Sequence, residues 1–112
     1  MPLISIKTSC KNLENSEDLV QIISDEISIL TGKSGEYIMT IIESNCQMTF
    51  AGKTSPCCYI EIKSIGSLNT TEISKSICNI ISSNTEIASN RIYISFEEFD
   101  ANNWGYNGNT FG

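Results

Sequence analysis

The chain has 112 residues, a length that suits one domain with a single hydrophobic core. Its 13 acidic and 7 basic residues give a net charge of -6, and without a Lys/Arg cluster we expect no nucleic-acid partner. No apolar run reaches the roughly 18–20 residues that span a bilayer, and the N-terminus lacks the pattern of a signal peptide. We therefore expect a cytoplasmic protein without a membrane partner, and leave open an export route that needs no leader.

The first half of the chain predicts a strand, a helix and a second strand. Residues 3–7 alternate apolar and polar side chains, as a half-buried strand does. Asn15 and Asp18 form a capping signal for a helix that Gly32 is placed to end in a left-handed conformation. The apolar stripe of this helix consists of Leu19, Val20, Ile22, Ile23, Ile27 and Leu30. Residues 37–42 predict a strand whose unbroken apolar run suggests burial on both faces.

The second half repeats this plan. Residues 58–63 predict a strand, Asn69 with Glu72 three positions later opens a helix, and residues 91–96 predict the returning strand. The apolar stripe of the second helix consists of Ile73, Ile77, Ile80 and Ile81. The first strands of the two halves match at an offset of 56 and the second strands at an offset of 55.

This repeat predicts a duplicated βαβ fold of the α/β (α+β) class within one domain, residues 1–112. The two units cover roughly residues 1–55 and 56–98, and an aromatic tail occupies residues 99–112. Because βαβ crossovers are right-handed, both helices should lie on one face of a mixed sheet of four strands.

The other face of that sheet also needs a cover, because its strands are too apolar for a solvated surface. Association of several copies would provide one. Alternatively, the C-terminal tail folds back over this face within one subunit. The tail places Trp104, Tyr106 and Phe111 among glycines and asparagines, and such large rings are expected to pack against a neighbouring subunit or a ligand.

Five cysteines, at positions 10, 46, 57, 58 and 78, form no Cys-x-x-Cys pair, and the chain has no histidine. These features argue against a structural metal site, and in a reducing compartment we expect the thiols to act as small buried hydrophobes. The lack of histidine also excludes Ser-His and Cys-His nucleophile pairs. Acid–base chemistry would have to use carboxylates, Lys, Tyr, Cys or the N-terminus.

Pro2 is the most informative single position. Methionine before a residue as small as proline is normally removed, so the mature chain would begin with a free secondary amine. Burial of an amine lowers its pKa, so in an apolar pocket the group would be neutral near pH 7 and able to act as a base. The alternative is that Pro2 only marks the start of an edge strand, where its missing N–H does no harm.

Short motifs in a fixed order carry a resemblance that spans essentially the whole chain. They are Met1-Pro2 before a strand, Thr31-Gly32-Lys33 with Tyr37-Ile38 soon after, Pro56-Cys57, Ser64-Ile65-Gly66, Arg91-Ile92-Tyr93-Ile94, and a closing Asn-x-Gly-aromatic-Asn-x-x-Thr-Phe at residues 103–111. Together they resemble the macrophage migration inhibitory factor family of the tautomerase superfamily. The family's duplicated βαβ fold agrees with the repeat found independently.

The resemblance implies a homotrimer with active sites between subunits and a cofactor-independent keto–enol tautomerase acting on phenylpyruvate and dopachrome-like compounds. It implies Pro2 as the catalytic base. Lys33 would meet the negative charge on the substrate, with help from backbone groups around Ile65. Without the resemblance, Lys33 is explained as a cation near a helix C-terminus.

The resemblance also implies that aromatic residues line the pocket, some of them from the adjacent subunit: Tyr37, Tyr93, Tyr106 and Phe111. Ser95 stands where the animal cytokines of the family carry an asparagine, which changes the hydrogen bonding offered to a ring-hydroxylated substrate. Cys57-Cys58 replaces their Cys-x-x-Cys, so their proposed thiol–disulfide activity should be missing. A cytokine-like signalling protein with a relic active site is the competing interpretation.

Overall fold

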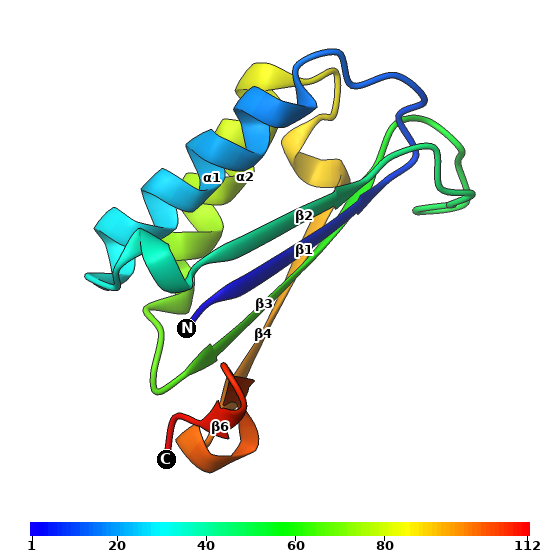
Figure 1. Cartoon of the computed structure of the whole chain (residues 1–112). Coiled ribbons are helices and arrows are strands. Elements are labelled where there is room, and N and C mark those ends of the chain that lie inside the picture. Colours follow the sequence, from blue (N-terminus) through cyan, green and yellow to red (C-terminus); the bar gives the residue numbers. More distant parts are fainter.

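Two βαβ units follow one another along the chain, as Figure 1 shows. The computed structural model describes residues 1–112. Its elements are β1 (Leu3–Thr8), α1 (Ser16–Thr31), η1 (Gly35–Tyr37), β2 (Met39–Glu43), β3 (Cys58–Ile65), α2 (Thr70–Asn84), η2 (Ser89–Arg91), β4 (Ile92–Phe99), η3 (Ala101–Asn103), β5 (Gly105–Tyr106) and β6 (Asn109–Thr110). None of the helices combines the length and the apolar composition needed to cross a membrane.

The main sheet has four strands in the order β2-β1-β3-β4. β1 and β2 run parallel, as do β3 and β4, while the central strands β1 and β3 are antiparallel. In this central pair, Ile4 lies opposite Ile62 and Ile6 opposite Ile60. The predicted α+β class and the mixed sheet are therefore confirmed.

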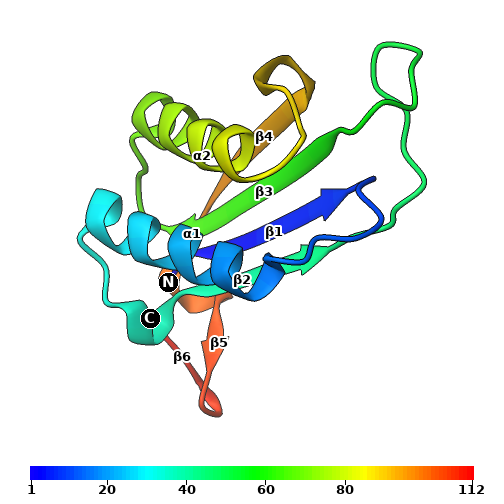
Figure 2. The same ribbon diagram turned by 90° about the horizontal axis from the view of Figure 1, so that it is seen from above.

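Both helices cover the same face of this sheet (Figure 2). Residues of β3 alternate strictly between buried and half-buried, because only every second side chain points at the helices. The apolar stripes of the helices meet them, and the resulting core is dominated by isoleucine: Ile4, Ile6, Ile23, Ile27, Ile60, Ile62, Ile73, Ile77, Ile81 and Ile87, with Leu19, Cys10 and Cys58. The opposite face of the sheet carries no helix.

The helix boundaries follow the predicted signals with one exception. Gly32 ends α1 with a φ of 69°, and its N–H donates to the carbonyl of Ser28 at 2.9 Å. Asn69 caps α2 as predicted, since its side chain accepts from the N–H of Glu72 at 3.2 Å. The expected cap at Asn15 is wrong. Its side-chain amide donates instead to the carbonyl of Asn84 at 3.2 Å, which ties the start of α1 to the end of α2.

The burial expected for residues 37–42 is also wrong for the single chain. Tyr37 belongs to the 3-10 turn η1, and the strand begins only at Met39. Met39 is 60% exposed and Ile41 39% exposed. Both residues belong to the edge strand β2. Thr40, between them, points toward the helices, since its hydroxyl bonds to Ser24 of α1 at 2.7 Å. Because side chains alternate along a strand, Met39 and Ile41 point to the face that the helices leave open.

The C-terminal tail does not cover the open face. It forms a short hairpin of β5 and β6 at one end of the sheet (Figure 1). Trp104 packs edge-on against Phe99 with ring centroids 5.4 Å apart. Tyr93, in the first part of β4, stays 64% exposed. The alternative in which the tail closes this face within one subunit is therefore wrong.

All five cysteines are free thiols, and the burial expected of them holds for three. Cys10, Cys57 and Cys58 are buried, whereas Cys46 and Cys78 are half-buried. Burial raises the pKa of the Cys58 thiol to about 12, with smaller contributions from neighbouring thiols. Cys58 is thus a protonated core residue and not a reactive thiolate.

Candidate active site

A mainly apolar cavity of about 280 Å³ lies at the end of the sheet where β1 begins and the tail hairpin is attached. Three segments build it: the start of β1, the η1 turn leading into β2, and the tail. Its walls are Met1, Pro2, Leu3, Glu36, Tyr37, Ile38, Met39, Trp104, Gly105, Tyr106 and Phe111. A concave, mostly apolar site with few polar groups is the usual form of a small-molecule pocket.

Pro2 lies at the inner wall of this cavity and is fully buried. Its carbonyl accepts a hydrogen bond from the N–H of Met39 at 3.1 Å, which continues the parallel ladder between β1 and β2. The ladder therefore fixes the backbone of Pro2. With Met1 attached, the Pro2 nitrogen is an amide, and the free amino group is that of Met1.

This terminal amino group is electrostatically perturbed. Burial lowers the pKa of the Met1 amine from 8.0 to about 6, and the positive charge of Lys33 and a hydrogen bond with its side chain act in the same direction. Both the lost hydration and the nearby cation disfavour the protonated amine. An amine at this end of the cavity is therefore mostly neutral at pH 7.

Lys33 is not among the residues that line the cavity, but it lies near the N-terminal amine, just after the end of α1 at Gly32. Its side-chain ammonium donates to the carbonyl of Ile65, at the end of β3, at 2.7 Å. Its own backbone is held from two sides, since its carbonyl accepts from Ser28 Oγ at 2.6 Å and its N–H donates to Thr31 Oγ1 at 3.3 Å. The structure thus brings together Lys33, Ile65 and the N-terminus from three separate elements.

Three of the predicted aromatic residues meet at the cavity wall. Tyr106 and Phe111 stack with ring centroids 5.5 Å apart and planes 7° from parallel. Tyr37 stands edge-on to both, at 5.5 Å from Tyr106 and 5.9 Å from Phe111. Edge-to-face pairs of this kind fix ring positions beyond simple burial. The turn before β2 and the tail are thereby joined over the site.

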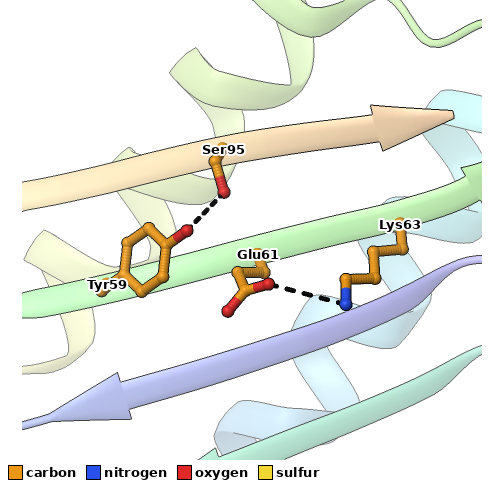
Figure 3. Close-up of polar contacts among 4 residues, drawn as sticks. All are labelled: Tyr59, Glu61, Lys63 and Ser95. Carbon is orange, nitrogen blue, oxygen red and sulfur yellow. Dashed lines mark hydrogen bonds and ion pairs between the residues drawn. The ribbon is translucent and has the colours of Figure 1, made fainter.

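Tyr93 and Ser95 lie elsewhere in the single chain. Tyr93 packs on Phe50 with ring centroids 4.5 Å apart and lines a separate cavity. Ser95 bonds to the Tyr59 hydroxyl at 2.8 Å on the open face (Figure 3). Tyr93 pairs with Tyr59 of β3, and Tyr59 in turn pairs with Lys7 of β1. Lys7 lies at the end of β1 that is far from Pro2, so Tyr93 is far from the cavity. Tyr93 and Ser95 would approach the cavity only from another copy of the chain.

Some wall residues were not singled out from the sequence. Leu3, Ile38 and Met39 are apolar residues of predicted strands. Such residues are expected in a sheet whether or not they line a cavity, so the sequence did not distinguish them. Glu36 directly precedes Tyr37, and adjacency to a predicted pocket residue was the available signal. No group of three or more His, Cys, Asp or Glu side chains is arranged to hold a metal ion.

Comparison with known proteins identifies the family. The macrophage migration inhibitory factor model matches residues 1–112. The chain belongs to this family. Curated relatives include macrophage migration inhibitory factor from Meriones unguiculatus, 30% identical, and from Xenopus laevis, 31% identical, each with 99% of both chains covered.

Solved structures of the same family share the fold. The macrophage migration inhibitory factor homologue from Prochlorococcus marinus is 42% identical and superposes with a TM-score of 0.95, covering 98% of this chain and 99% of its own. The similar protein from Entamoeba histolytica is 28% identical with a TM-score of 0.91, covering 98% of each chain. The family and the fold named from the motifs are therefore confirmed.

Proposed function

We propose that this protein is a cofactor-independent keto–enol tautomerase acting on arylpyruvates such as phenylpyruvate and on dopachrome-like compounds. The observation that carries the proposal is an apolar aromatic cavity at the N-terminus, in which burial and Lys33 lower the pKa of the Met1 amine to about 6. The Pro2 amine freed by removal of Met1 would meet the same two influences. Membership of the macrophage migration inhibitory factor family supports the same reaction.

Pro2 is the proposed base once Met1 is removed, because its nitrogen then becomes a secondary amine. This neutral amine takes a proton from the carbon next to the substrate carbonyl. The electron pair of the broken C–H bond forms the carbon–carbon double bond, and the ammonium returns the proton to the carbonyl oxygen. One group thus acts as base and then as acid, with no net gain or loss of atoms.

Lys33 is the proposed electrostatic partner. Negative charge develops on the substrate oxygen as the proton leaves, and a fixed cation lowers the energy of that state. Its ammonium has three N–H donors, of which the Ile65 carbonyl takes one at 2.7 Å. The remaining donors are available for the carboxylate or the enolate oxygen of the substrate.

A homotrimer with active sites between subunits is part of the proposal. It is supported by the exposed apolar residues on the sheet face without helices, among them Met39, Ile41 and Tyr93. In such an assembly Tyr93 and Ser95 of a neighbouring subunit would complete the cavity. Aromatic rings from two chains would then pack on the aryl group and shield the Pro2 amine.

The test compares phenylpyruvate tautomerisation by the wild-type protein, the Pro2→Gly variant and a variant with an alanine inserted between Met1 and Pro2. The insertion turns the proline nitrogen into an amide while keeping the ring. We expect both variants to lose at least about 100-fold in kcat/KM, the usual scale of acid–base catalysis. Intact mass must show loss of Met1. Equal rates, or retained methionine in an active enzyme, would remove Pro2 from the mechanism.

A signalling protein with a relic active site is the second candidate. It is favoured by the vertebrate relatives at about 30% identity, whose name refers to inhibition of macrophage migration. The two candidates separate in one experiment. If Pro2→Gly abolishes tautomerisation but preserves an effect on macrophage migration, signalling does not need the catalytic base.

A further inference from the structure

Glu36 is the only charged side chain among the eleven residues that line the cavity. It lies in the η1 turn between Lys33 and β2. Ser34 caps this turn, and its hydroxyl accepts from the N–H of Glu36 at 3.3 Å, which holds the backbone in place. The backbone that carries Glu36 at the cavity wall is thus held in a short turn.

No cation of the chain neutralises Glu36. The ammonium of Lys33 is directed to the carbonyl of Ile65 at 2.7 Å. The chain's one ion pair joins Lys63 to Glu61 at 3.7 Å on the open face (Figure 3). Glu36 is itself exposed, so its carboxylate lies at the solvent side of a cavity whose other walls are mostly apolar. Its influence on a ligand is therefore greatest at low salt.

We propose that Glu36 is a specificity-determining residue of the cavity, one that disfavours negative charge on the ligand and favours ligands presenting a hydrogen-bond donor or a positive charge toward the η1 turn. Lys33 and Glu36 then act in opposite directions on an anionic ligand. The cation attracts the carboxylate of the keto acid, while the anion weakens that attraction and so favours neutral ligands over anionic ones. The catalytic meaning of this role rests on the proposed function.

Glu36 acts on the ligand and not on the base. For the Met1 amine at this end of the cavity, the causes that lower the pKa are burial and Lys33, and Glu36 is not among them. Removal of its charge should therefore change ligand preference without moving the pH dependence of the reaction. A role in tuning the base would move both.

A binding experiment tests this role without requiring turnover. Trp104 is the only tryptophan of the chain and lines the cavity, so its fluorescence reports occupancy. The probes are 3-phenylpropionate and its neutral isostere 3-phenylpropionamide, titrated into the wild type and Glu36→Gln. At low salt we expect the variant to bind the acid about three- to tenfold more tightly, as expected for one carboxylate acting at several ångströms, and the amide within about twofold of wild type.

The matched control is Glu17→Gln, which removes the same charge in the first turn of α1, the end of that helix remote from Lys33. It should leave both affinities unchanged. In 1 M salt, where the screening length is about 3 Å, the gain of Glu36→Gln should shrink. The role would be overturned if Glu36→Gln changed the affinities of acid and amide equally or changed neither. It would also be overturned if neither probe quenched the fluorescence saturably.

Kinetics separate failure of this role from failure of the proposed function. If the protein tautomerises phenylpyruvate, Glu36→Gln should raise kcat/KM for this anion relative to its methyl ester and keep the same apparent pKa in the pH profile. An unchanged acid-to-ester ratio in an active enzyme refutes the role of Glu36 alone. An inactive protein whose acid-to-amide binding ratio still responds to Glu36→Gln refutes the tautomerase alone.

Discussion

At the scale of single residues, the proposed chemistry depends on one amine and one cation held close together. Burial and Lys33 both lower the pKa of the Met1 amine. In the proposed mechanism the same lysine would both meet the substrate charge and disfavour protonation of the Pro2 amine. Lys33 is itself held by Ile65, Ser28 and Thr31, which makes this effect a property of the fold.

Lys33→Met tests this coupling. Lys33 is one cause of the lowered pKa of the Met1 amine, and the Pro2 amine freed in its place would lie near the same cation. Loss of the cation should therefore move the rise of kcat/KM with pH upward. The move should be partial, because burial remains and is the larger cause. The plateau rate should fall about 100- to 1000-fold through lost stabilisation of the enolate. A reduced plateau with an unmoved midpoint would show that Lys33 does not act on the base.

Two of the resemblance-based site residues also show the limit of sequence reasoning. The motif order named Pro2, Lys33, Ile65 and the aromatic wall, and the fold does bring these together within one chain. The motif order could not tell whether Tyr93 and Ser95 reach the cavity, because that depends on whether a second copy of the chain is present. Glu36 lay outside the motifs, since a charged residue in a turn looks like ordinary surface until a cavity is seen beside it.

At the scale of elements, the ends of α1 and β4 position the site. Both helices and the strands β1, β3 and β4 follow the predicted patterns, because the alternation of two and the spacing of three to four residues follow directly from side-chain geometry. The strand expected over residues 37–42 begins only at Met39. The capping signal at Asn15 failed because a local pattern cannot reveal a competing partner, here the carbonyl of Asn84 from the other βαβ unit.

Gly32→Ala should destabilise the protein by about 1 kcal/mol, because its φ of 69° strains any residue with a side chain. Gly35→Ala is the matched control. Gly35 has no positive φ, and an added Cβ there meets nothing within 4 Å. Urea denaturation should therefore show a lower midpoint for the first variant and little change for the second. Equal midpoints for both would mean that the left-handed end of α1 carries no strain.

Arg91 holds the loop that leads into β3. Its guanidinium donates to the carbonyls of Pro56 at 3.0 Å, Phe50 at 3.1 Å, Lys53 at 3.2 Å and Ser55 at 3.0 Å, and it lies 5.4 Å from the centroid of the Phe50 ring. No lysine can reproduce this planar fork of donors.

Arg91→Lys should consequently cost about 2 kcal/mol, the range for hydrogen bonds to a charged group, and Arg91→Ala somewhat more. Faster amide exchange confined to the Phe50 loop would accompany the loss of stability in denaturant titrations. Wild-type stability in Arg91→Lys would show that the point charge matters and the fork does not.

At the scale of the whole molecule, the sheet has one face covered by helices and one left open. The continuous apolar sequence of residues 37–42 predicted burial on both faces, which the single chain does not provide, since Met39 and Ile41 remain exposed. A sequence pattern indicates that a residue should be buried, but it does not show whether the same chain or a second copy covers it. The exposed residues therefore mark the place where the proposed trimer would be tested.

Ile41→Glu places a carboxylate on this open face, where Ile41 is 39% exposed in the single chain. Burying an unpaired charge between subunits is costly, so we expect the proposed trimer to dissociate. The mass measured by light scattering should then fall from three times the 12.4 kDa chain mass to that of a single chain. Because the site would lose Tyr93 and Ser95 of the neighbour, tautomerase activity should fall with the mass.

Ile29→Glu is the control. Ile29 is 75% exposed on α1, so this variant should leave the mass and the activity unchanged. A wild-type protein that scatters light as one chain would contradict the trimer, and full activity in a monomeric Ile41→Glu variant would show that one chain suffices for catalysis.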